Sequence, residues 1–500
     1  LEPIAPLFVS SVDSGNLAAS LWAFKQGCLE LLHRPVVAGN ALDGLVDHYR
    51  ILGGRKNVPE GLETLVALKK SAKWLAPLLQ MRIDSAPPSK RARTKQHAWW
   101  QAQIARRIEA LGEEARSFMP WCLPEYEALR TLSPAQFDLP SKPLTPQNAD
   151  AFYDELDRKL QALNAANVSV AVCTLAGRLR DEIPPCRVRL KSLAARLGSL
   201  ATTSERLVRE MNFGVLIDVR RKLLSIGYDV AQQQLSKSCY DLLASESRTA
   251  AFIAVAKSEV VQEVWFRMGR QHTLCEGENV MISWTGTMFE YLMPVIWMRS
   301  HPQTLLDRTV RSAVRAQKTY ATKRRVPWGI SEAAYSKTDQ DGNYQYAAFG
   351  VPGLALNVAR AGYLVVSPYS SCLGLMIDST SSVENLRAMA QKRWLGEYGF
   401  YESADYTASP RRRVFAPKCE LVRCWMAHHQ GMSMAALCNL FHDMAFQRWF
   451  HAEPLVQASE LILQERPIRV RPIADSQPRR ILSFTRTTPK AAAPNTRASS

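Results

Sequence analysis

Three glutamates in the C-terminal half of the sequence lie in segments that also contain tryptophan or tyrosine. They are Glu290, Glu332 and Glu402. Glycoside cleavage needs two carboxyl groups: one protonates the departing oxygen, and the other attacks the anomeric carbon or activates water. Aromatic rings provide flat apolar faces for sugar rings, and burial among them raises the pKa of a glutamic acid, so that it stays protonated near neutral pH. The pattern therefore favours chemistry on sugars.

A further segment, residues 426–432 (Met-Ala-His-His-Gln-Gly-Met), contains two adjacent histidines. Adjacent helical positions point about 100° apart, so we expect hydrogen bonding to sugar hydroxyls or to the backbone rather than metal binding. No metal and no cofactor are expected, because zinc-ligand spacing and a glycine-rich phosphate loop are both missing from the sequence. The residues expected to bind substrate surround the glutamates: Trp284, Trp328, Tyr335, Tyr346, Tyr401, Asp405, His428, His429 and Gln430.

Each carboxylate also has a structural interpretation. Glu290 lies among apolar neighbours and could hydrogen-bond a facing loop. Glu332 could be an acid at a helix N-terminus, stabilised by the helix dipole. Glu402 and Asp405 could be turn or capping groups. Residue types alone leave both interpretations open.

The elements that must position these residues are mainly helical. Residues 1–205 show apolar side chains at helical spacing between polar loops, with one helix entry expected at residues 13–16 and a helix over residues 99–118. This part contains no polar or titratable cluster that suggests chemistry. We therefore expect a helical linker or packing domain.

Residues 206–466 are expected to form the domain that carries the site. A short β-hairpin is predicted from residues 213–218 and 223–228. After it, helical segments alternate with loops rich in Gly, Pro, Tyr and Trp, which suits a helical toroid whose loops form a cleft at one end. One helix start is predicted from a capping box at Ser381 and Glu384. Residues 467–500 are dominated by Pro, Arg, Thr, Ala and Ser, and we expect a disordered basic tail.

Composition restricts the possible function classes further. The formal net charge is +17, but the basic stretches at residues 90–95 and 469–490 belong to no recognisable nucleic-acid-binding module, so nucleic acid is not an expected partner. The apolar run at residues 291–298 is far shorter than the roughly 20 residues that span a bilayer. The ten cysteines form no CxxC pair, which favours free thiols in a reducing compartment. The chain begins with Leu1, so we expect a segment of a longer polypeptide.

Several ordered motifs resemble the glycoamylase-like middle domain of cyclic β-1,2-glucan synthases, together with the helical region that precedes it. The resemblance covers about residues 7–466. Its motifs lie at residues 12–17, 212–214, 225–228, 240–246, 283–294, 328–332, 344–353, 398–402 and 426–432.

The resemblance implies an (α/α)6 toroid that remodels β-1,2-glucan by retaining transglycosylation and closes linear chains into rings. It also implies a place on the cytoplasmic side of the bacterial inner membrane, and two partner domains in the full-length protein: a glycosyltransferase and a phosphorylase-like domain. On this basis we expect Glu332 as the acid/base and Glu402 as the nucleophile, with Glu290 as the reserve candidate. Two alternatives are an endo-β-1,2-glucanase, which would release short linear products, and a catalytically silent glucan-binding domain, which would bind without turnover.

Overall fold

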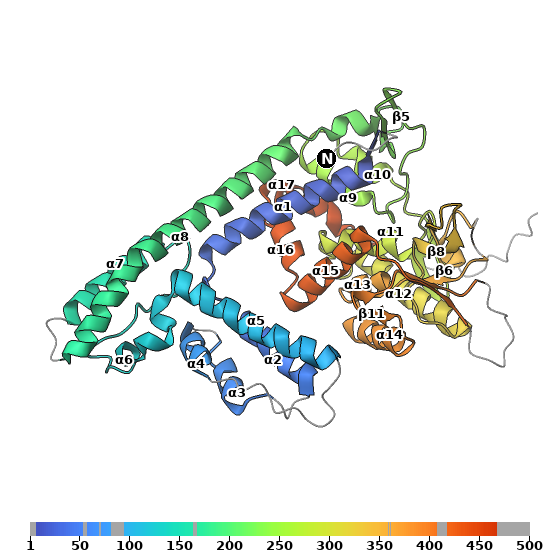
Figure 1. Ribbon diagram of the computed structural model, residues 1–500. Helices are drawn as coiled ribbons and strands as arrows, with labels where there is room; N and C mark the ends of the chain where they lie inside the picture. Colours follow the sequence, from blue (N-terminus) through green and yellow to red (C-terminus); the bar gives the residue numbers. More distant parts are fainter. Residues whose placement is uncertain are drawn as a thin grey trace, which may run out of the picture.

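The structure is a computed structural model that describes residues 7–53, 58–69, 72–81, 95–163, 168–358, 360, 362–407 and 418–467. Helices dominate it, which confirms the predicted mainly α class (Figure 1). Buried apolar side chains form two clusters, one within residues 37–190 and one drawn from residues 12–23 and 208–463. The predicted domain boundaries at residues 205 and 466 stay predictions, and the predicted tail lies outside the described residues from residue 468 onward.

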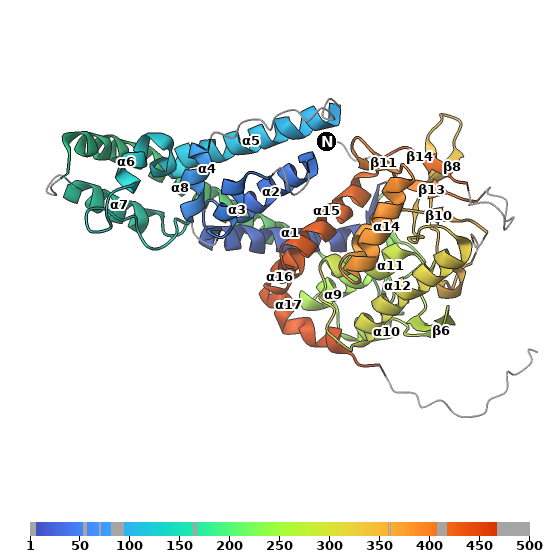
Figure 2. The same cartoon turned by 90° about the horizontal axis from the view of Figure 1, so that it is seen from below.

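The first cluster belongs to a unit of short and medium helices. Pairs such as α2 and α5 pack side by side, and α7 packs on the first half of α8 (Figure 2). Its elements are α2 (Asn40–Gly53), α3 (Glu60–Val66), η2 (Ala72–Trp74), α4 (Leu75–Gln80), α5 (Lys95–Phe118), η3 (Pro120–Cys122), η4 (Pro124–Tyr126), α6 (Glu127–Arg130) and α7 (Ala149–Ala162).

Two long helices, α1 (Ser11–His33) and α8 (Val170–Glu210), lie along each other and connect this unit to the rest of the chain (Figure 1). The N-cap of α1 is Ser10, whose hydroxyl accepts a hydrogen bond from the backbone N–H of Asp13. The predicted entry at residues 13–16 therefore lies inside the helix. Strand β1 (Phe8–Ser10) immediately precedes α1 and pairs with β4.

The second cluster fills the unit that carries the predicted motifs. Its helices are η6 (Phe213–Leu216), α9 (Arg248–Ala256), α10 (Glu263–Arg267), α11 (Met288–Leu292), η7 (Met293–Ile296), α12 (Leu305–Arg324), η8 (Pro352–Leu354), α13 (Pro368–Gly374), α14 (Ser379–Gln391), α15 (Ala427–Phe441), α16 (Ala445–His451), α17 (Pro454–Ser459) and η9 (Glu460–Gln464). Among the described residues, no helix is long and apolar enough to span a bilayer.

Short antiparallel strands connect these helices. They are β2 (Ile217–Asp218), β3 (Leu223–Leu224), β4 (Gly227–Asp229), β5 (Gln234–Leu235), β6 (His272–Cys275), β7 (Glu278–Met281), β8 (Ala333–Thr338), β9 (Tyr344–Ala347), β10 (Val365–Val366), β11 (Leu395–Gly396), β12 (Gly399–Phe400), β13 (Ser403–Asp405) and β14 (Glu420–Val422). Within the described ranges, two sheets have three strands, in the orders β1-β4-β5 and β10-β13-β14, and the others are two-stranded pairs.

Two local predictions need correction. The hairpin at residues 213–228 reduces to the pair β2–β3, because β4 pairs instead with β1 from the distant N-terminal segment. The capping box at Ser381 is wrong: Asp378 is the N-cap of α14, and its carboxylate accepts from the backbone N–H of Ser381. An aspartate three residues earlier satisfies the exposed N–H groups of the first turn, so Ser381 lies within the helix.

Candidate active site

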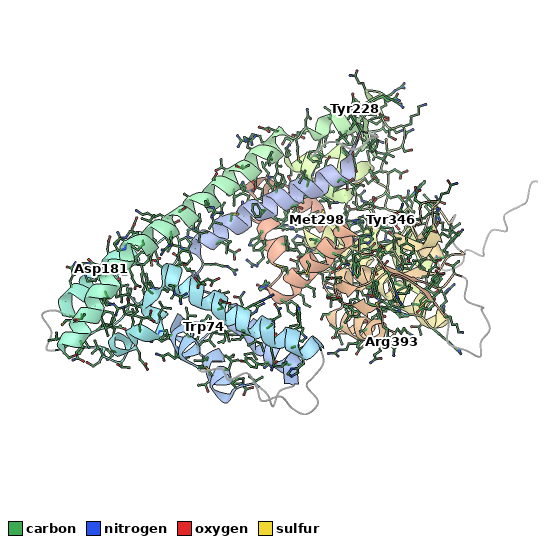
Figure 3. The ribbon with its side chains drawn as sticks, viewed as in Figure 1. Trp74, Asp181, Tyr228, Met298, Tyr346 and Arg393 are labelled. Carbon is green, nitrogen blue, oxygen red and sulfur yellow. The ribbon has the colours of Figure 1, made fainter. Side chains whose placement is uncertain are left out.

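A cavity of about 910 Å³ opens between six parts of the second unit. Its walls come from the first turns of α1, the loop before α9, the α11–η7 segment, the β8–β9 hairpin, α15 and α16. The size lies within the ~300–1,000 Å³ typical of small-molecule sites. Figure 3 labels Tyr346, on β9, which forms part of this wall. Of the predicted site residues, Glu332, Tyr346 and His428 line the cavity.

Glu332 is a half-buried side chain held by a rigid backbone. Its carbonyl oxygen accepts a 2.9 Å hydrogen bond from the hydroxyl of Tyr369. That tyrosine hydroxyl lies 2.7 Å from the hydroxyl of Ser331. Its Oε1 accepts a 2.9 Å hydrogen bond from the hydroxyl of Tyr346. Burial raises the pKa of Glu332 to about 7, while the hydrogen bond from Tyr346 opposes that rise and the negative charge of Glu290 adds to it. Glu332 can therefore exchange a proton near neutral pH.

A chain of hydrogen-bonding contacts leads from Tyr346 through His429 to a second carboxylate, that of Glu402. The hydroxyl of Tyr346 is 3.2 Å from Nε2 of His429, and Nδ1 of His429 is 2.8 Å from Oε1 of Glu402. The ring of His429 stacks on Tyr369 at 3.7 Å. Both His429 and Glu402 are fully enclosed, with exposed fractions of 0% and 2%. Glu402 is thus separated from the cavity by His429 and positions that ring.

Glu246, which the sequence analysis did not select, also faces the cavity. It lies in the loop before α9, and its Oε2 accepts a 3.2 Å hydrogen bond from the hydroxyl of Ser245. Burial raises the pKa of Glu246 to about 8, and the negative charges of Glu290 and Glu332 raise it further. The sequence signal for this residue was its place in the motif at residues 240–246. Tyr240 and the exposed Asp13 line the same cavity.

The loop that carries Glu246 is anchored by a buried arginine. The guanidinium of Arg248 donates to the carbonyl oxygens of Ser245, Glu290 and Tyr291 at 2.9, 2.8 and 2.6 Å. These bonds connect the loop before α9 to α11. Because the guanidinium satisfies three carbonyls at once, the loop has a defined position relative to the opposite wall.

Glu290 has a different environment from Glu332 and Glu246. It is 5% exposed and forms a capping box with Thr287 at the start of α11. Its carboxylate accepts hydrogen bonds from the backbone N–H groups of Thr285 and Thr287, from both of their hydroxyls and from the hydroxyl of Ser283. With its lone pairs used in this way, Glu290 holds the loop at residues 283–287 and does not line the cavity.

The other predicted residues lie outside the cavity lining. Trp328 and Tyr335 are buried, and the hydroxyl of Tyr335 donates to Gln345. Asp405 is buried and accepts from the hydroxyl and the backbone N–H of Ser336. The remaining three are at least partly exposed on neighbouring surfaces: Trp284, Tyr401, which packs against Trp425, and Gln430.

The described lining of the site includes carboxyl, imidazole and phenol groups. No cluster of three or more His, Cys, Asp or Glu suited to a metal ion occurs among the described residues. Burial lowers the pKa of His428, and the neighbouring His429 lowers it further, which favours the neutral form of this imidazole on the cavity wall. Its Nε2 lies 3.3 Å from the hydroxyl of Tyr346.

Comparison with known proteins relates this unit to glycoside-processing enzymes. A family model described as "Glycoamylase: Putative glucoamylase" matches residues 239–454. The chain is 33% identical over 485 residues to "Cyclic beta-(1,2)-glucan synthase NdvB" of Rhizobium meliloti (strain 1021). That alignment covers 95% of this chain and 15% of the relative, so the chain spans a small part of that protein. The resemblance predicted from the motifs is confirmed by these two matches.

Two solved structures show a weaker likeness. A β-1,2-glucanase from Parabacteroides distasonis aligns with a TM-score of 0.41 at 14% identity, over 54% of this chain and 41% of that chain. An endo-β-1,2-glucanase from Talaromyces funiculosus aligns with a TM-score of 0.41 at 12% identity, over 91% of this chain and 80% of that chain. These scores are too low to carry an argument about the toroid, which stays a prediction.

Proposed function

We propose that this chain, which contains a glycoamylase-like domain related to a cyclic β-1,2-glucan synthase, is a retaining transglycosylase acting on β-1,2-glucan. One observation carries the proposal. Glu332 and Glu246 face the same cavity, and each has a pKa raised by burial into the range where it can exchange protons. A glycosidase uses two carboxyl groups in one cavity, and the different surroundings of the two groups let one act as the acid and the other as the nucleophile.

We assign Glu332 as the nucleophile and Glu246 as the acid/base, which replaces the pairing expected from the sequence. The hydroxyl of Tyr346 stabilises the carboxylate form of Glu332, whereas burial and the negative charges of Glu290 and Glu332 raise the pKa of Glu246 and favour its protonated form. Glu402 is enclosed behind His429, so it serves as a positioning residue.

In the first step, a carboxylate oxygen of Glu332 attacks the anomeric carbon while Glu246 gives its proton to the departing glycosidic oxygen. The bond to that oxygen breaks, and an ester between the glucan and Glu332 forms. In the second step, Glu246 removes the proton from an acceptor hydroxyl, whose oxygen attacks the same carbon and releases Glu332. Two inversions give overall retention. A hydroxyl from the far end of the same chain yields a ring, another chain yields a longer product, and water yields hydrolysis.

In the full-length protein, we propose that this domain works on the cytoplasmic side of the bacterial inner membrane. It would act beside a glycosyltransferase that makes the glucan and a phosphorylase-like domain. The resemblance to the synthase supports this placement, and the chain itself covers 15% of that relative.

The test is incubation of the purified chain with linear β-1,2-glucan, followed by separation of products by size and assay of reducing ends. Rings or longer chains with retained configuration, absent in a folded Glu332→Gln variant, are the expected result. Short linear products would assign hydrolysis instead. Unchanged glucan, with circular dichroism showing a folded protein, would contradict an enzymatic function.

A further inference from the structure

The first two turns of α1 form a wall of the cavity, although α1 lies far outside the segment that matches the glycoamylase family. Asn16 and Ser20, four residues apart, present one helix face to the cavity. In Figure 1, α1 lies beside α8, α9 and α16, which pack against it. A helix that ends at His33, well before the next helix of this unit begins at Phe213, therefore contributes to its site.

The position of α1 is closely defined. Gly15 meets α9 so tightly that a Cβ added there would lie 2.6 Å from Cβ of Ala250 and 2.7 Å from its Cα. The hydroxyl of Ser11 donates a 2.7 Å hydrogen bond to the carbonyl oxygen of Ser225. With the backbone held at both points, the side chain of Asn16 is presented to the cavity from a rigid support.

Two residues that line the cavity each carry a buried polar atom that has no hydrogen-bond partner among the residues that the structure describes. These atoms are the acceptor Oδ1 of Asn16 and the donor Nε1 of Trp297. The side chain of Trp297 is 8% exposed. Leaving buried polar groups unpaired is costly, and such groups are uncommon in folded proteins. One acceptor and one donor match a sugar hydroxyl, which both donates and accepts.

Part of the cavity lining, around Trp297, is apolar. Met293 and Ile296 of η7, Met432 of α15 and Phe446 of α16 line the same cavity. The ring of Trp297 meets Phe446 edge-on, at 5.4 Å between centroids. Apolar and aromatic faces with a few polar groups suit the C–H faces of a pyranose ring, and they disfavour a charged ligand.

We propose that Asn16 and Trp297 form a sugar-binding subsite that holds a glucose unit of the glucan away from the bond being cleaved. The inference rests on the proposed function, because the ligand is taken to be β-1,2-glucan. It assigns α1 a direct part in substrate binding. Asn16 accepts a hydrogen bond from one sugar hydroxyl, and the indole N–H of Trp297 donates to another or to the same one.

The test measures binding of long linear β-1,2-glucan and of the β-1,2-linked disaccharide by calorimetry. All proteins carry Glu332→Gln, so that the ligand stays intact. Asn16→Ala and Trp297→Phe, which keeps an aromatic ring while removing the N–H, should each weaken binding of the long glucan about three- to tenfold, the loss expected for one hydrogen bond. Disaccharide binding should change less. The matched control is Leu17→Ala, since Leu17 is 51% exposed and does not line the cavity.

Thermal unfolding without ligand checks that each variant is folded. If the parent binds the long glucan and both variants bind it equally well, the subsite is wrong while the proposed function stands. If the Glu332→Gln parent binds no glucan and the wild-type chain turns none over, the proposed function fails and the subsite fails with it. An equal loss in the Leu17→Ala control would also overturn the subsite.

Discussion

Replacing Tyr346 with phenylalanine should move the pH dependence of catalysis in a defined direction. The hydroxyl of Tyr346 donates a 2.9 Å hydrogen bond to Oε1 of Glu332, and this bond lowers the pKa of Glu332 against the effect of burial. In the Tyr346→Phe variant the carboxylate loses that support, so the pKa of Glu332 rises further. Because a nucleophile must be ionised, the acid limb of kcat/KM against pH moves to higher pH.

The size of the change follows from the strength of the bond. A hydrogen bond to a charged group contributes about 1.5–3 kcal/mol to stability, and Glu332 is half-buried beside an open cavity, which favours the lower end. Since about 1.4 kcal/mol corresponds to one pKa unit, we expect a displacement of about one pH unit. At a pH well below both limbs, kcat/KM of the variant, taken relative to its own plateau, should therefore be about tenfold lower than that of the wild-type chain at the same pH.

The assay is the initial rate of product formation from linear β-1,2-glucan, measured at each pH at which circular dichroism shows both proteins folded. Tyr344→Phe is the matched control, because Tyr344 lies on the same strand and does not line the cavity. An acid limb that stays in place, or that moves to lower pH, would refute the assignment of Glu332 as an ionised nucleophile supported by Tyr346.

Three further changes test other parts of the site. Glu246→Gln should abolish turnover of glucan but spare the first release of phenolate from an activated aryl substrate, because that departure needs no proton whereas the second step still needs the base; loss of the phenolate burst in rapid-mixing experiments would contradict an acid role. Glu290→Ala should lower the free energy of unfolding by about 2–4 kcal/mol, because the cap and several buried donors lose their acceptor; an unchanged urea midpoint would contradict this. Gly15→Ala should cost about 1–3 kcal/mol by the same measurement, because the added Cβ would lie within 3 Å of backbone atoms of Ala250; wild-type stability would show that α1 can move.

The site could be predicted in part from local sequence. Glu332 was selected from its aromatic neighbours, and the structure places it in the cavity with Tyr346 and His428. The same local rule also selected Glu402, whose neighbours include tyrosines. In the structure this carboxylate is enclosed against His429. The sequence shows that a carboxylate has aromatic neighbours along the chain, but it does not show whether the carboxylate faces solvent or the protein interior.

Local reasoning also left open the structural role of Glu290. Its hydrogen bonds come from residues within seven positions along the chain, so a Thr-x-x-Glu capping box at residues 287–290 was readable from the sequence. The box was instead predicted at Ser381, where Asp378 takes the capping role. A capping pattern can be satisfied by any of several nearby acceptors, and the choice depends on where the preceding backbone turns.

By itself, the sequence determined the mainly helical class, the resemblance to cyclic β-1,2-glucan synthases and one cavity-facing carboxylate, because these depend on residue periodicity and on motifs contiguous in the chain. Tertiary structure decided which residues share a cavity. Asn16 and Glu332 line one cavity with Glu246 and Trp297, although they are more than three hundred positions apart in the sequence. Asn16 reaches this cavity because α1 packs on α9 through Gly15. Such proximity arises from packing between distant helices, which no local pattern of residue types specifies.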